Sequence, residues 1–85
     1  MKTLEYYAKP DCAPCEVEWL HLLRSNLGEA YDIQKVDTTS HSGLARAKTL
    51  GIKAVPTVVV LNEFNDVIDS AIGARAVSDL IDSLE

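Results

Sequence analysis

The valine-rich run from Thr57 to Leu61 is the strongest strand signal in the sequence and limits the fold most. It is bounded by Pro56 and Asn62, and β-branched residues between such boundaries are typical of a strand. Residues 62–66 have the composition of a turn. We therefore expect residues 67–72 to pair back on this run as an antiparallel strand, which makes a β-hairpin.

Strand-like and helical segments alternate before this hairpin. Residues 4–7 form a short β-like run, and residues 31–36 predict a second strand. The segment between these two strands, roughly residues 13–29, predicts a helix, and Gly28 marks its C-terminal end. Residues 44–50 predict a shorter helix. The apolar side chains that we expect on the buried face of the first helix are those of Val17, Leu20, Leu23 and Leu27. Two strands joined through a helix are expected to be parallel.

The last segment predicts a closing helix, because its apolar residues have the spacing i, i+3, i+4, i+7. These residues are Val77, Leu80, Ile81 and Leu84. The order of elements is then β-α-β-α-β-β-α in a single α/β domain over residues 1–85. We expect a four-stranded mixed sheet flanked by three helices that cover both of its faces.

Charge and hydropathy exclude several classes of function. The net charge is −5, and 47% of the residues are hydrophobic. Nucleic acids and anionic membranes bind basic surfaces, so we expect neither as a partner. The longest apolar stretch, residues 54–61, is too short to span a bilayer. Glu5 interrupts the region where the apolar core of a secretory signal would run, so we expect a cytoplasmic protein. We also expect a monomer.

The two cysteines, Cys12 and Cys15, lie where the first strand leads into the first helix. A spacing of three residues across a first helical turn places both thiols on one face, near the separation of a disulfide. The free N–H groups and partial positive charge of a helix start favour the thiolate, which is the nucleophile of disulfide exchange. Pro14 suits this first turn. We expect Cys12 to attack a substrate and Cys15 to resolve the mixed disulfide.

Two other interpretations of the cysteine pair are less favoured. A structural zinc site needs four ligands, and His21 and His41, which could complete the set, lie far along the helix and in a distant loop. A purely structural disulfide is unusual in the reducing cytoplasm. We therefore expect no metal and no cofactor besides the redox-active Cys12–Cys15 disulfide.

The sequence as a whole resembles the thioredoxin/glutaredoxin superfamily, and its members of about this length, such as small archaeal thioredoxins. Three landmarks carry the resemblance. They are Cys12-Ala13-Pro14-Cys15 after a strand, Gly51-Ile52-Lys53-Ala54-Val55-Pro56-Thr57 in the middle of the chain, and Ile72-Gly73 after the hairpin. A Cys-x-x-Cys pair beside a β-α-β pattern is the general cue for such a redox motif.

The resemblance implies a thioredoxin fold and a substrate-binding surface. Pro56 would be the cis-proline, and Val55 would offer its backbone to an extended substrate chain. Gly73 would keep the rim of the binding groove low. Pro14 and Lys9 are the other expected substrate contacts, since glutaredoxins often have a lysine three residues before the first cysteine.

The sequence also departs from the family pattern. Thioredoxins usually have a buried aspartate six residues before the first cysteine, and this chain has Tyr6 there. Glu5 is adjacent, but a shift of one residue in a strand turns a side chain to the other face. Asp11 replaces the tryptophan that often precedes the first cysteine.

The resemblance implies a reductase of protein disulfides that works by dithiol exchange and receives electrons from a protein reductase. A glutathione-dependent, glutaredoxin-type reductase is the less favoured alternative. Glutaredoxins hold glutathione with two glycines and an acid, whereas Gly73 is followed here by Ala74 and Arg75. A non-catalytic binding module or a metal-linked dimer is the third interpretation.

Overall fold

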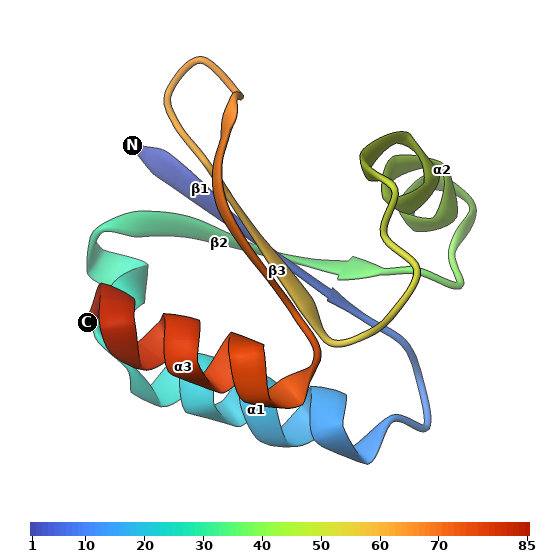
Figure 1. Cartoon of the computed structure of the whole chain (residues 1–85), viewed down its shortest axis with the longest axis horizontal. Coiled ribbons are helices and arrows are strands. Elements are labelled where there is room, and N and C mark those ends of the chain that lie inside the picture. Colours follow the sequence, from blue (N-terminus) through green and yellow to red (C-terminus); the bar gives the residue numbers. More distant parts are fainter.

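Four strands form one mixed sheet in the order β2-β1-β3-β4 (Figure 1). The computed structural model describes all residues from 1 to 85. Its strands are β1 (Lys2–Ala8), β2 (Tyr31–Asp37), β3 (Thr57–Leu61) and β4 (Val67–Ile72). Its helices are α1 (Ala13–Arg24), α2 (His41–Leu50) and α3 (Ala74–Leu84), with a 3₁₀ turn η1 (Leu27–Glu29). The predicted order of elements and the predicted mixed sheet are confirmed.

The strand pairing follows from the connections between the strands. β1 pairs with β2 in parallel, because α1 and η1 return the chain to the same end of the sheet. β3 runs antiparallel to both β1 and β4. β1 and β3 are therefore the central strands, which agrees with the complete burial of β3.

Helices cover both faces of the sheet, as Figure 1 shows: α1 and α3 lie side by side on one face, and α2 lies on the other. The alternation of side chains along β1 divides the core accordingly. Tyr6 belongs to the larger apolar cluster, together with Cys15 and Leu22 of α1 and Ile81 of α3. Tyr7 belongs to the smaller cluster on the α2 face.

The buried face of α1 differs from the one that the sequence pattern predicts. Val17, Leu20 and Leu23 are exposed, by 61%, 48% and 54% respectively, and so the predicted stripe was wrong. The helix instead buries Cys15 and Leu22. Burial of the cysteine pair determines the rotation of the helix, and this rotation turns the apolar stripe toward solvent.

The predicted end of the first helix was also wrong. α1 ends at Arg24, and Ser25 has extended backbone. Its hydroxyl and its backbone N–H both bond to the carbonyl oxygen of Leu22, which ends the α-helical ladder. Gly28 therefore lies in the separate turn η1, where Leu27 is still buried as expected.

Helix α2 begins three residues earlier than predicted, at His41. The Ser40 hydroxyl accepts a hydrogen bond from the Gly43 N–H at 3.0 Å, so Ser40 is the N-cap. Gly43 lies against the end of β2, where a Cβ atom would come within 1.8 Å of the Asp37 carbonyl oxygen. Glycine at this position thus allows α2 to pack closely on β2.

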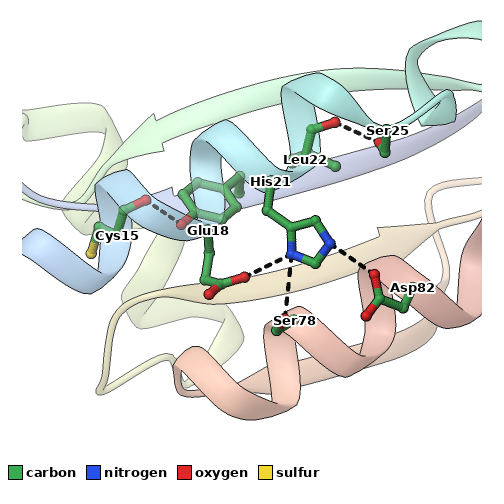
Figure 2. A network of polar contacts seen from close by, with 8 residues as sticks. Cys15, Glu18, His21, Leu22, Ser25, Ser78 and Asp82 are labelled. Atoms are coloured by element: carbon green, nitrogen blue, oxygen red, sulfur yellow. Dashed lines mark hydrogen bonds and ion pairs between the residues drawn. The ribbon is translucent and has the colours of Figure 1, made fainter.

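A polar network joins α1 and α3, which lie on the same face of the sheet (Figure 2). In α1, His21 Nδ1 lies 3.0 Å from Glu18 Oε1. His21 Nε2 lies 2.8 Å from Asp82 Oδ1 of α3, and the Ser78 hydroxyl is also within reach of the ring. The hydrogen bond to Glu18 and the contacts with Asp82 raise the pKa of His21, and they outweigh the opposing effect of burial.

None of the helices has both the length and the apolar character that a membrane crossing requires.

The burial pattern of α1 predicts that substitutions of two of its leucines lower the free energy of unfolding by different amounts. Leu22→Ala should lower the free energy of unfolding by about 2–5 kcal/mol, because it leaves a cavity in the core. Leu20→Ala on the exposed face should lower it by less than about 1 kcal/mol. Urea unfolding followed by circular dichroism measures both. Equal costs, or a larger cost at Leu20, would contradict the observed rotation of the helix.

The His21 network predicts a pH-dependent contribution to stability. The pKa of His21 is raised in the folded state, so its stabilising effect is complete below the unfolded value of about 6.5. The effect is lost as the pH rises through the folded-state pKa. His21→Gln should therefore flatten the fall in unfolding free energy above pH 6.5. His41→Gln, at an exposed position, is the matched control and should leave that slope unchanged.

Candidate active site

The two cysteines form a disulfide at the start of α1. Their Cα atoms are 5.2 Å apart. Cys12 is the N-cap residue, and its Sγ accepts a hydrogen bond from the Cys15 N–H at 3.2 Å. Cys12 is 9% exposed and Cys15 is 2% exposed, so the first sulfur is the more accessible one.

The helix start determines which sulfur is suited to attack. In the reduced protein, an N–H group aimed at Cys12 Sγ and the partial positive charge of the helix end both stabilise a thiolate there. Cys15 lies one turn further along, within the apolar cluster. This arrangement supports the predicted roles, with Cys12 attacking and Cys15 resolving.

The segment before β3 lies beside this pair. The Val55–Pro56 peptide bond is cis, the geometry that the resemblance implies. Pro56 is fully buried. Val55 is half-buried and packs against both apolar clusters, including the one that contains the cysteines.

Gly73 connects the end of β4 to the same segment. Its N–H donates a hydrogen bond to the Pro56 carbonyl oxygen at 2.9 Å. Its φ of 91° lies in the region that favours glycine, and no other atom comes within 4 Å of the position of a Cβ. The structure thus brings Gly73 and Pro56 together, and a side chain at residue 73 would project into open space.

Lys9 and Pro14 lie on either side of Cys12 in the sequence, and both are exposed. Lys9 lines a cavity of about 310 Å³ together with Cys15. It also lines a second cavity, of about 420 Å³, together with Val55. Lys9 therefore lies between the cysteine pair and the segment before β3. The roles of Lys9 and Pro14 as substrate contacts stay predictions.

Tyr6 occupies the place of the family's buried acid. Its side chain is fully buried, and its hydroxyl donates a hydrogen bond to the Cys15 carbonyl oxygen at 2.5 Å. Its ring also packs on Trp19, with ring centroids 5.2 Å apart. Burial, and then the nearby Glu18 carboxylate, raise the pKa of Tyr6 far above its ordinary value. Tyr6 holds the first turn of α1 and stays protonated.

Glu5 lies on the opposite face of the sheet, as the one-residue shift requires. It is 6% exposed and accepts hydrogen bonds from the Tyr7 hydroxyl at 2.9 Å and from Arg46 Nη2 at 3.3 Å. Burial and the bond to Glu5 raise the pKa of Tyr7 to about 12. Glu5 is therefore a buried carboxylate paired with the partly exposed Arg46 of α2, on the face of the sheet away from the cysteines.

No group of three or more histidine, cysteine or acidic side chains is placed to hold a metal ion. His21 pairs with Glu18 and Asp82, and His41 is the exposed first residue of α2. The two cysteines therefore have no neighbouring third ligand.

Glu16, Lys35 and Asp37 line the cavity beside Cys15, although none of them was predicted from the sequence as a site residue. Glu16 directly follows Cys15 in the sequence. Lys35 and Asp37 lie in β2, which is parallel to β1 in the sheet. The ends of neighbouring parallel strands meet at one edge, and this edge carries the cysteine loop. The predicted β-α-β unit was the signal that could have located them.

No protein-family model matches the chain, and no curated protein matches it either. Solved structures do match over nearly its whole length. Thioredoxin f2 in a complex with ferredoxin:thioredoxin reductase is 25% identical, with a TM-score of 0.79 over 98% of this chain and 74% of that one. Mitochondrial thioredoxin 3 from Saccharomyces cerevisiae, in its oxidized form, is also 25% identical, with a TM-score of 0.74 over 96% and 77% of the two chains.

Thioredoxin 1 from Thermosipho africanus is more distant in sequence, at 18% identity, but its fold is as similar to this chain as that of thioredoxin f2. Its TM-score is 0.79, and the match covers 96% of this chain and 89% of that one. The four-stranded mixed sheet and the three helices described above are thus the elements that this chain shares with thioredoxins.

Proposed function

The chain is a member of the thioredoxin-like superfamily, and on that premise we propose that it reduces disulfide bonds in other proteins through Cys12 and Cys15. The single observation that carries the proposal is the Cys12–Cys15 disulfide at the N-terminus of α1 in a thioredoxin fold. A cysteine pair that can close a disulfide within one helical turn can cycle between dithiol and disulfide without a change of fold.

The proposed reaction has two exchange steps. The Cys12 thiolate attacks one sulfur of a substrate disulfide, so that a mixed disulfide forms and the other substrate sulfur leaves as a thiolate, which takes up a proton. Cys15 then loses its proton and attacks Cys12 Sγ. The mixed disulfide breaks, the second substrate thiol is released, and the Cys12–Cys15 disulfide carries the oxidised state.

The proposed substrate surface surrounds Cys12. An extended substrate segment would pair with the backbone of Val55, just before the buried Pro56. Gly73 supports this proposal because it is bonded to Pro56 and has no side chain to obstruct the groove. Pro14 and Lys9 are exposed, lie close to Cys12 in the sequence and complete the proposed contacts.

The proposed electron donor is a protein reductase. A solved thioredoxin of the same fold forms a complex with ferredoxin:thioredoxin reductase, which supports a donor of this class. We further propose that the protein acts as a monomer in the cytoplasm, on disulfide-containing proteins, and without a metal or an added cofactor. Its charge of −5 supports the view that nucleic acids and membranes are not its partners.

Trapping of substrates tests the central proposal. Cys15→Ser should accumulate mixed disulfides on Cys12 when mixed with a disulfide-containing protein such as insulin, because the resolving thiol is missing. Non-reducing electrophoresis and mass spectrometry identify the adducts. Cys12→Ser is the matched control and should form none. Trapping on Cys15 alone would reverse the two roles, and no adduct with either variant would disprove the proposed exchange.

A comparison of electron donors separates the proposed function from the glutathione-dependent alternative, which Lys9 favours. Turnover of insulin disulfides should be supported by NADPH with a thioredoxin reductase. Glutathione with glutathione reductase should support less than about a tenth of that rate, because no acid follows Gly73 to hold glutathione. Faster turnover with glutathione would identify the protein as glutaredoxin-like. A metal-loaded dimer with no measurable dithiol potential would favour a binding module.

A further inference from the structure

A cavity of about 310 Å³ adjoins the resolving cysteine. It opens between the loop after β1, the first turn of α1 and the end of β2. The residues that line it are Ala8, Lys9, Pro10, Cys15, Glu16, Lys35 and Asp37. Cys15 is only 2% exposed, and this is the cavity whose lining includes it. A space of this size with charged walls holds several water molecules.

The resolving step requires Cys15 to lose a proton in a nearly buried place. The usual acid is absent because Tyr6 stands in its position. The Tyr6 hydroxyl already donates to the Cys15 carbonyl oxygen, and burial keeps it protonated. Glu5 is on the other face of the sheet and is paired with Arg46. Neither Tyr6 nor Glu5 can therefore accept the proton.

Asp11 directly precedes Cys12 but does not line the cavity. Two other carboxylates near the pair are occupied by other partners. Glu18 faces α3 and is paired with His21 at 3.0 Å. Asp37 Oδ1 accepts hydrogen bonds from the Thr39 N–H at 2.8 Å and from the Thr39 hydroxyl at 2.7 Å. These bonds, aided by the nearby Lys35, lower the pKa of Asp37 and make it a poor base.

Glu16 is the carboxylate that remains. It follows Cys15 directly in α1, lines the same cavity and is exposed to solvent. Lys9 and Lys35 line the same cavity, and Lys35 Nζ lies 4.9 Å from the centroid of the Trp19 ring. These two ammonium groups stabilise negative charge in the cavity, and Asp37 partly offsets them.

We propose that Glu16 accepts the proton of the Cys15 thiol, through water in this cavity, when Cys15 resolves the mixed disulfide. This inference rests on the proposed dithiol exchange. The S–H bond of Cys15 breaks, its proton passes to the Glu16 carboxylate, and its sulfur attacks Cys12 Sγ. The bond between Cys12 and the substrate breaks, and the substrate leaves as a thiolate. Glu16 then returns the proton to solvent, to which it is exposed.

The two steps can be timed separately with 5,5′-dithiobis(2-nitrobenzoate). Attack by Cys12 on this aromatic disulfide releases one nitrothiobenzoate anion, and attack by Cys15 on the mixed disulfide releases the second. Stopped-flow absorbance therefore gives one phase for each cysteine. Glu16→Gln should slow the second phase about tenfold at pH 7, which is less than the roughly 10²–10⁴-fold effect of a directly positioned base because the proton passes through water. It should change the first phase by less than about twofold.

The pH profile distinguishes proton transfer from a structural effect. At about pH 10 a thiol ionises without a base, so the second phase of Glu16→Gln should approach that of the unmodified protein. Glu16→Asp should recover part of the rate at pH 7. Asp37→Asn and Glu18→Gln are matched controls, because both remove a carboxylate near the pair, and they should leave the second phase within about twofold.

Three outcomes would overturn the inference. They are an unchanged second phase in Glu16→Gln, a loss of equal size in either control variant, and a loss that persists at pH 10. In all three cases the unmodified protein would still release both anions, so the proposed function would stand. If the unmodified protein released only the first anion, the proposed dithiol exchange itself would be wrong.

Discussion

The hydrogen bond from the Tyr6 hydroxyl to the Cys15 carbonyl oxygen joins the central strand β1 to the first turn of α1. It lies in the larger apolar cluster, where both partners are buried. The bond and the burial of Cys15 together determine the rotation of α1 about its axis. That rotation places Trp19 against Tyr6, His21 against α3, and Glu16 beside the cavity at the end of β2.

The alternation of side chains along β1 gives the two faces of the sheet different chemistry. Tyr6 supports the cysteine pair on the face covered by α1 and α3. Tyr7 and Glu5 point to the other face, where Arg46 of α2 neutralises the buried carboxylate. The acid closest in sequence to the family position is therefore used for packing of α2. Any proton transfer to or from Cys15 has to involve groups on its own side of the sheet.

Much of the fold could be predicted from local patterns. The hairpin of β3 and β4 was predicted with the bounds that the structure has, because Pro56 and the polar residues after Leu61 interrupt a β-branched run. Helix α1 was predicted with the wrong buried face. Val17, Leu20 and Leu23 have helical spacing, but spacing alone does not show whether an apolar stripe meets the core or solvent.

Local patterns of residues predict the order of strands and helices, the mixed sheet and the position of the cysteine pair at a helix start. These features depend on residues close together in the chain, whose propensities and spacing act locally. Other features appear only in the folded chain: the hydrogen bond of Gly73 to Pro56, the pairing of Glu5 with Arg46, and the position of Lys35 and Asp37 beside Cys15. Each of these contacts joins distant segments, so it depends on strand register and helix rotation, which are set by packing of the whole core.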